Sequence, residues 1–228
     1  MNWMAGIRAV TFDVGSTLIE VWPSVGRIYA EVGAAHGHAS LPPEELNRRF
    51  HAAFRAHGKS VNTQSEWARI VDETFAGMLP KAASGSFFPD LYARFTEANA
   101  WRIFEDVEPT LRALRGCGLR LGIISNWDDR LRPLLHTLRL ARWFDAIVIS
   151  CEVGASKPAP AIFAAAQQQL GVPPDSILHV GDSLEADVAG ANAAGFRGVQ
   201  IDRQAKSSDK SRIGSLRDLL PRVKSSSK

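Results

Sequence analysis

Cysteine, long apolar runs and a leader segment are all scarce or missing in this chain. Only two of the 228 residues are cysteine, Cys117 and Cys151, too few for a disulfide framework. We expect them to be reduced, buried thiols, as in a cytoplasmic protein. No apolar run approaches the roughly 18 residues that a membrane helix needs, and the first dozen residues lack the basic and apolar segments of a signal peptide. A membrane protein or a secreted protein is therefore not expected.

A strong excess of one charge is also missing. The chain has 27 Lys and Arg against 24 Asp and Glu, a net charge of +3, and its sequence pI is about 9.1. The basic excess lies in residues 203–228, which hold 8 Lys or Arg and 2 Asp, whereas residues 1–202 carry a net charge of −3. Because short charged tails are usually solvated, this excess does not predict a nucleic-acid partner. With 45% hydrophobic and 22% charged residues, the composition is that of a globular protein.

Short β-branched segments alternate with segments of helical apolar spacing along most of the chain. The predicted strands are 7–12, 119–124, 145–150, 176–180 and 198–201. The helices expected between them are 109–116, 129–140, 160–170 and 185–194. Strands with little polar alternation, such as LRLGII, suit a parallel sheet covered on both faces. The pattern predicts an α/β fold with a doubly wound (Rossmann-like) parallel sheet.

The stretch between residues 23 and 103 has no convincing strand. Its apolar spacing predicts four helices, at 24–35, 43–56, 65–78 and 90–101. A helical block inserted after the first strand of such a sheet is a candidate lid. We therefore predict two domains: an α/β core of residues 1–20 and 105–228, and an all-helical cap of residues 21–104.

Polar residues follow four of the predicted strands. Ligands of open α/β sheets bind beyond the carboxyl ends of the strands, so these residues are candidates for chemistry. They are Asp13 in VTFDVGSTL, Ser125 in GIISNWDD, Lys157 in GASKPAPAIF and Asp182 in HVGDSLEAD. One aspartate at a strand end is more often a turn residue; the coincidence of four such positions is what favours a site.

These segments together resemble the haloacid dehalogenase (HAD) superfamily, in the subgroup with a helical cap after the first motif. The resemblance covers residues 7 to 202, and its most specific parts are GASKPAP and HVGDSLEADVAGANAAG. It implies that Asp13 is the nucleophile and that Ser125 and Lys157 hold the transferred group. It also implies Mg²⁺ as cofactor, with these ligand positions: Asp13, the Gly15 carbonyl, Asp182 and, directly or through the shell around the metal, Asp187.

The chemistry of these residue types agrees with that implication. A carboxylate can form a covalent intermediate that water then hydrolyses. Mg²⁺ prefers oxygen ligands and shares its shell with a substrate phosphate, and an ammonium offsets the repulsion between carboxylate and phosphate. The resemblance therefore implies a Mg²⁺-dependent phosphatase for a small phosphorylated metabolite. We expect the protein to act as a monomer or a homodimer.

One position departs from the family pattern. Metal-dependent phosphatases of the family carry a second Asp two residues after the nucleophile, as general acid and base, and this chain has Gly15 there. Loss of such a group typically costs about 10²- to 10⁴-fold in rate. A backbone carbonyl remains for a metal, so we expect metal binding to be kept and phosphatase activity to be weak.

Other functions therefore stay open. A 2-haloacid dehalogenase would use Asp13 to displace halide and needs no leaving-group acid, and a catalytically impaired relative would act as a binding or regulatory protein. Phosphonatases of the family also lack the second Asp but use a cap lysine; Lys59 and Lys81 are the lysines available between residues 21 and 104, and neither lies in a convincing motif.

Three further side chains are candidates for contact with substrate. Trp22 follows the first motif, and Asn126 and Trp127 follow Ser125. By contrast, we expect His179, within a predicted strand, to be buried structure.

Overall fold

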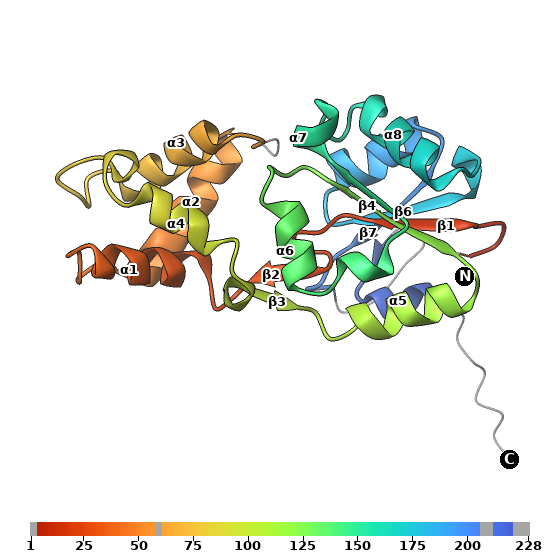
Figure 1. The fold of residues 1–228 in the computed structure, drawn as a ribbon, viewed down its shortest axis with the longest axis horizontal. Coiled ribbons are helices and arrows are strands. Elements are labelled where there is room, and N and C mark those ends of the chain that lie inside the picture. The colour runs from red at the N-terminus through yellow and green to blue at the C-terminus, as the bar shows by residue number, and fades with distance from the viewer. Residues whose placement is uncertain (1–3, 58–60, 206–211, 221–228) are drawn as a thin grey trace, which may run out of the picture. The chain divides into compact units, whose positions relative to one another are not determined.

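The computed structural model describes residues 4–57, 61–205 and 212–220. Its central sheet has six parallel strands in the order β5-β4-β1-β6-β7-β8 (Figure 1). The strands are β1 (Ala9–Phe12), β4 (Arg120–Ser125), β5 (Ala146–Ile149), β6 (Ile177–Gly181), β7 (Arg197–Ile201) and β8 (Arg212–Ile213). The predicted α/β fold with a doubly wound parallel sheet is confirmed, and five of these strands lie where the sequence predicts them.

Helices cover both faces of this sheet, which explains why its strands lack polar alternation. Figure 1 shows α5 (Val107–Gly116) and α8 (Pro160–Leu170) on opposite sides of the sheet. Pro160 opens α8, and Gly171 closes it with a φ of 61°, as expected for these two residue types. The remaining helical segments of this part are α7 (Ser150–Val153), α9 (Gly190–Ala193), η3 (Ala141–Trp143), η4 (Pro174–Ser176), η5 (Leu184–Ala189) and η6 (Leu216–Leu219).

The insert forms its own helical body. Its helical segments are α1 (Val25–Ala35), α2 (Pro43–His57), α3 (Gln64–Phe75), η1 (Ala83–Gly85), α4 (Phe88–Arg94) and η2 (Ala98–Ala100). Thr63 and Glu66 form a reciprocal capping box at the start of α3. Aromatic rings fill the centre, where Tyr29 stacks on Phe75 with 5.5 Å between ring centroids. The burial of these large rings stabilises the body.

The predictions for the ends of the insert are partly wrong. The predicted helix 90–101 ends at Arg94, and Trp101 instead begins β3 (Trp101–Ile103), which pairs with β2 (Ile19–Val21). A pairing between strands about 80 residues apart outweighs the local helical spacing, and strands of three residues have too short a pattern to be recognised.

Two helices of the predicted α/β core also differ. The predicted helix 129–140 is the shorter α6 (Leu131–Thr137), because Asp128 and Arg130 bind each other in the loop before it. The predicted helix 185–194 is split into η5, a π-helix, and α9.

The chain divides into two compact units. The first, called the core unit here, comprises residues 1–20, 103–125 and 141–228, and the second, the helical unit, comprises residues 21–102 and 126–140. The predicted domain boundaries differ from these units at residues 103–104 and 126–140, and the assignment of a cap to 21–104 stays a prediction.

Two smaller expectations can be compared with the structure. Cys117 is exposed and Cys151 partly exposed, so the expectation of buried thiols is wrong; Cys117 ends α5 at the surface. Among the described helices, none combines the length and the apolar character needed to cross a membrane. Lys59 and most of the basic tail lie outside the described residues.

Candidate active site

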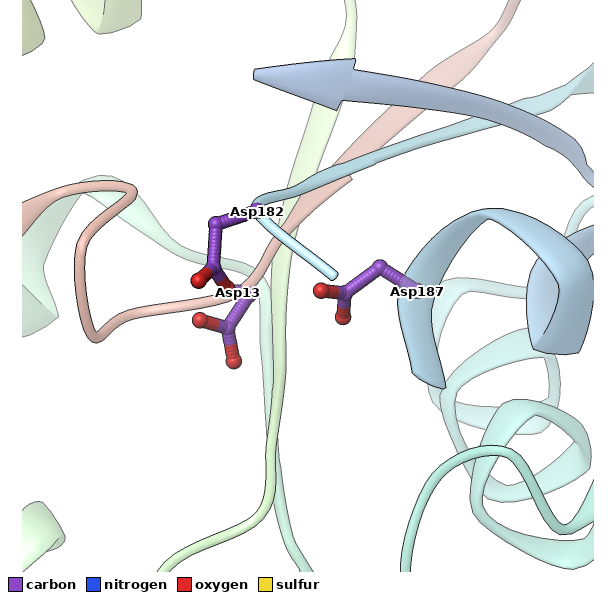
Figure 2. A group of neighbouring side chains, drawn as sticks. All are labelled: Asp13, Asp182 and Asp187. Carbon is purple, nitrogen blue, oxygen red and sulfur yellow. The ribbon is translucent and has the colours of Figure 1, made fainter. Parts of the chain in front are cut away.

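The candidate residues of the core unit meet at the carboxyl edge of the sheet. Asp13 follows β1, Ser125 ends β4 and Asp182 follows β6, and β1 lies between β4 and β6 in the sheet. Strands that follow along the chain are thus added on one side of β1 and then on the other, and a crevice for ligands opens at such a switch point in these folds. Figure 2 shows Asp13 and Asp182 side by side, with the Asp187 carboxylate turned toward them.

Asp13 is held by two donors on the same oxygen. Ser125 Oγ donates to its Oδ1 at 3.0 Å, and Lys157 Nζ donates to Oδ1 at 2.6 Å. The Asp13 main chain is fixed as well, since its N–H donates to the Val180 carbonyl at 2.9 Å. Asp13, Ser125 and Lys157 are 8%, 1% and 4% exposed. The structure therefore brings together the three predicted catalytic residues.

Lys157 lies between two carboxylates. Its Nζ donates at 2.6 Å to Asp13 Oδ1 and at 2.6 Å to Asp187 Oδ1. Burial disfavours the ammonium, but Asp13 and Asp187 outweigh this effect and raise the pKa of Lys157. The lysine is therefore charged at neutral pH and supplies a positive charge between the two carboxylates.

The two carboxylates beside Lys157 differ in their pKa. Burial raises the pKa of Asp13, although the Lys157 ammonium acts against it. Burial also disfavours the charge on Asp187, yet Lys157 and His179 outweigh it and lower the pKa of that group. One ammonium cannot fully balance two buried carboxylates, although Lys157 Nζ lies 2.6 Å from an oxygen of each of them. Burial therefore places a cost on the charge of Asp13.

The π-helix η5 brings Asp187 into the site. The amides of Asp187 and Val188 both donate to the Ser183 carbonyl, and this wider turn places Asp187 inside (1% exposed) while Leu184 stays outside (62% exposed). Asp187 lies against the main chain of Gly181, so closely that a Cβ atom there would overlap its carboxyl group. Gly181 in the GDS segment is therefore required for space, and π-turns of this kind recur at functional sites.

A buried histidine completes the arrangement. His179 Nε2 lies 3.1 Å from Asp187 Oδ1, and its Nδ1 lies 2.9 Å from Thr11 Oγ1. The imidazole is 0% exposed, and burial lowers its pKa although Asp187 acts against this. The prediction that His179 is buried is correct, but its contact with Asp187 is not predicted from the sequence. Local spacing carries no signal for it, since residues 179 and 11 come to the same level only through the register between β6 and β1.

Three carboxylates form a group that a cation fits. One oxygen from each of Asp13, Asp182 and Asp187 lies within 4.8 Å of the others. Oxygen-only donors of this charge suit a hard divalent cation such as Mg²⁺. The oxygens of Asp187 already accept bonds from Lys157, His179 and the Ser183 amide, whereas both side-chain bonds that the structure shows for Asp13 go to Oδ1. Asp13 and the exposed Asp182 are therefore better placed to bind a metal than Asp187.

The loop after Asp13 makes a tight turn. Gly15 forms an isolated β-bridge with Ile19. Ser16 has a φ of 57°, a backbone conformation that residues other than glycine rarely adopt. Gly15 brings no side chain to this turn, so the position offers a cation its backbone carbonyl alone.

The three predicted substrate contacts lie in the helical unit. Trp22 is 44% exposed and stacks under the Arg102 guanidinium at 3.9 Å. Trp127 packs against Trp101 with 5.4 Å between ring centroids, and Asn126 is half-buried. Their role toward a substrate stays a prediction.

Comparisons with known proteins agree with this geometry. Residues 7–195 match the family described as haloacid dehalogenase-like hydrolase. The human "Haloacid dehalogenase-like hydrolase domain-containing protein 3" is 34% identical, covering 86% of this chain and 82% of its own. A "Glyceraldehyde 3-phosphate phosphatase" from Methanopyrus kandleri is 31% identical, covering 86% of this chain and 84% of its own.

A solved structure of a 2-haloacid dehalogenase from Pseudomonas syringae is also similar. It is 25% identical, covers 93% of this chain and 96% of its own, and has a TM-score of 0.64. Since the family match spans most of the chain, and the same segments carry the site at the sheet edge, the chain belongs to the haloacid dehalogenase-like hydrolases and is a hydrolase of that family.

Proposed function

We propose that the protein is a Mg²⁺-dependent phosphatase that hydrolyses a small phosphorylated metabolite through an aspartyl-phosphate. The observation that carries this proposal is the position of Asp13, held at Oδ1 by both Ser125 and Lys157 beside the carboxylate of Asp182. The similarity to the Methanopyrus kandleri phosphatase supports it.

In the first step, the Asp13 carboxylate attacks phosphorus and the bond from phosphorus to the leaving oxygen breaks. The leaving group departs with the electron pair of that bond and takes a proton from water. Lys157 offsets the repulsion between the carboxylate and the phosphate, and Ser125 donates its hydroxyl proton in a hydrogen bond to a phosphoryl oxygen. In the second step, water attacks the same phosphorus, the bond to Asp13 breaks, and inorganic phosphate and the free carboxylate are released.

Mg²⁺ is proposed to be held by Asp13, the Gly15 carbonyl and Asp182, with Asp187 beside them. When bound, it neutralises charge on the phosphate and on the carboxylates near it. It would also offset the cost that burial places on the charge of Asp13.

Phosphatase activity is proposed to be weak toward poor leaving groups, because Gly15 cannot donate a proton. In the described part of the core unit, the proton-bearing groups bonded to Asp13 are Ser125 and the Lys157 ammonium, and the pKa of that ammonium is raised. Neither is a good acid at neutral pH. Activated aryl phosphates should therefore be hydrolysed much faster than alkyl phosphates.

The test is hydrolysis of p-nitrophenyl phosphate with and without Mg²⁺. We expect turnover that requires Mg²⁺, is abolished in Asp13→Asn and is unchanged in Asp175→Asn, an exposed aspartate that serves as the matched control. Gly15→Asp should raise the rate on alkyl phosphates by about 10²-fold if the missing acid limits catalysis. Turnover that does not need Asp13 would contradict the proposal.

The similarity to the Pseudomonas syringae dehalogenase keeps a second candidate function, displacement of halide from a 2-haloacid by Asp13. Halide release from 2-chloropropionate without phosphate release would establish it. If neither substrate is turned over, the site would instead serve a binding or regulatory protein.

We further propose that the helical insert of residues 21–104 acts as a cap that selects the substrate. Asn126, Trp22 and Trp127 are proposed to contact the substrate. The enzyme is also proposed to be cytoplasmic and to act as a monomer or a homodimer. Single alanine variants at these three residues should change KM more than kcat if they bind substrate. Light scattering after size exclusion measures the oligomeric state.

A further inference from the structure

His179 is a buried titratable group in the described part of the core unit that the proposed steps do not use. It lies in the middle of β6 (Ile177–Gly181) and is 0% exposed, so it does not meet a substrate. Both of its ring nitrogens nevertheless have side-chain partners, Thr11 Oγ1 at 2.9 Å and Asp187 Oδ1 at 3.1 Å. A buried imidazole with two specific partners is not explained by packing alone.

The contact with Asp187 fixes which nitrogen carries the proton. Lys157 Nζ donates to Asp187 Oδ1 and the Ser183 amide donates to Oδ2, so both oxygens of this carboxylate accept hydrogen bonds and neither is placed to donate one. His179 Nε2 must then be the N–H that donates to Asp187 Oδ1. The Thr11 hydroxyl lies 2.9 Å from the other ring nitrogen, Nδ1, and 3.4 Å from the Leu178 carbonyl. The shorter contact is the one in which Thr11 donates to Nδ1, which makes the ring the neutral Nε2–H tautomer.

A continuous series of hydrogen bonds therefore links Thr11, within β1, to Asp13, just after β1. Thr11 donates to His179, His179 donates to Asp187, and Asp187 Oδ1 accepts Lys157 Nζ, which also donates to Asp13 Oδ1. Thr11 and Asp13 lie two residues apart, and each is at one end of the series. Three hydrogen bonds orient the Asp187 carboxylate. Its Oδ1 accepts His179 and Lys157, and its Oδ2 accepts the Ser183 amide at 2.9 Å.

We propose that His179 is a positioning residue, held as its Nε2–H tautomer by Thr11, which directs Asp187 Oδ1 at Lys157 and so places the Lys157 ammonium against Asp13. The kinetic consequence rests on the proposed phosphatase function, whereas the structural consequence does not. Partners in such a supporting position typically change activity by about 10- to 100-fold when they are lost.

Two substitutions at His179 separate the hydrogen bond from the packing. His179→Leu removes the donor, and His179→Gln keeps an amide N–H near the position of Nε2. Phe163→Leu is the matched packing control, because the Phe163 ring contacts the imidazole edge-to-face, 5.5 Å between centroids, without a bond to Asp187. For an activated aryl phosphate, we expect His179→Leu to lower kcat by about 10- to 100-fold with little change in KM, His179→Gln to restore most of the loss, and Phe163→Leu to leave kcat nearly unchanged.

A spectroscopic measurement tests the proposal without turnover. In ¹⁵N spectra of the full-length protein, His179, assigned by its loss in His179→Gln, should show a protonated Nε2 and an unprotonated Nδ1. The ¹H–¹⁵N signal of the Lys157 ammonium should shift or broaden in His179→Leu and return in His179→Gln.

Each result decides a separate point. An Nδ1–H tautomer, or a Lys157 signal that is the same in all variants, would overturn the proposal. Equal losses of kcat in His179→Leu and Phe163→Leu would reduce His179 to a packing residue. Absence of phosphatase activity in the unmodified enzyme would contradict the proposed function alone, since the tautomer and the lysine signal would still be measured.

Discussion

Gly181 shows how one missing side chain shapes the site. The Asp187 carboxyl group occupies the space where a Cβ atom of residue 181 would lie, so any other residue must displace either β6 or Asp187. The consequence reaches Lys157, because Asp187 is one of its two partners.

Gly181→Ala should therefore reduce both stability and activity. We expect a loss of about 1–3 kcal/mol in the free energy of unfolding, the range for overpacked interiors, and a marked fall in kcat. Gly116→Ala is the control, because a Cβ atom there meets open space within α5, where alanine is favoured over glycine. Urea unfolding and turnover of an aryl phosphate measure the two effects. A Gly181→Ala protein as stable and active as the Gly116→Ala protein would contradict the prediction.

The nucleophile itself should destabilise the metal-free protein. Burial raises the pKa of Asp13 above its ordinary value, so the folded state prefers the protonated carboxyl group. The contribution of this group favours folding below its unfolded pKa and is lost as the pH rises through its folded pKa.

Asp13→Asn should therefore abolish activity but raise stability at pH 7. We expect a gain in the free energy of unfolding without Mg²⁺, because the substitution removes a charge that burial disfavours. The gain should shrink near pH 3, where the wild-type carboxyl group is protonated. Urea unfolding at both pH values, with EDTA present, checks this, and equal gains at both values would show that charge is not the cause.

At the level of single residues, the sequence predicts the polar groups of the site better than their partners. Asp13, Ser125, Lys157 and Asp182 each follow a strand, and a parallel sheet brings such positions to one edge. His179 and Thr11 look like ordinary strand residues, and their bond depends on the register between β1 and β6. That register is set by long-range pairing, so the Asp187 partners could not be read from local spacing.

Among the elements, the segment after β7 is joined to the start of α5 by hydrogen bonds to one carboxylate, that of Asp106. Asp106, just before α5, accepts Arg203 Nη1 at 2.8 and 2.7 Å, Ser215 Oγ at 2.6 Å and the Leu216 amide at 2.8 Å. Arg203 also donates to the carbonyl of Thr17, in the loop after the nucleophile. Asp106 thus ties the segment 212–220, and through Arg203 the loop that follows Asp13, to α5.

Asp106→Asn should loosen these connections. Burial disfavours the charge, but Arg203, Ser215 and the Leu216 amide lower the pKa of Asp106. Its stabilising contribution is thus present above the unfolded value of 3.8 and is lost as the pH falls through its folded pKa. We expect a loss of about 3 kcal/mol at pH 7, smaller near pH 3, by urea unfolding. Asp175→Asn, at an exposed aspartate, should change little; a similar loss in both variants would contradict the prediction.

Long helices and strands can be predicted from the sequence, whereas very short ones cannot. Helices such as α1, α2, α5 and α8 show several turns of apolar spacing and appear where expected. The strands β2, β3 and β8 have two or three residues each, too few for a period to be seen. The π-helix η5 was predicted as α-helix, because its widened turn depends on where Asp187 is held rather than on residue spacing.

For the whole molecule, each unit has an apolar core of its own. The helical unit is built around residues such as Ile28, Leu46 and Ile70, whereas the core unit has a cluster that includes Ile124, Phe163 and Ile177. The three grouped carboxylates, Asp13, Asp182 and Asp187, all belong to the core unit. A cation bound there acts on the folded core unit directly and on the helical unit only if the two units are energetically coupled.

Mg²⁺ alone should therefore stabilise the two units unequally. At a concentration 100 times its dissociation constant, a ligand that binds only the folded state adds about 2.7 kcal/mol. We expect hydrogen exchange to slow in peptides from β1, β4 and β6, and to stay nearly unchanged in peptides from α1, α2 and α3. Asp182→Asn, which removes an exposed carboxylate of the group, should abolish the protection without unfolding the protein. Equal protection in both units would mean that they fold as one cooperative body, and protection that survives in Asp182→Asn would place the cation elsewhere.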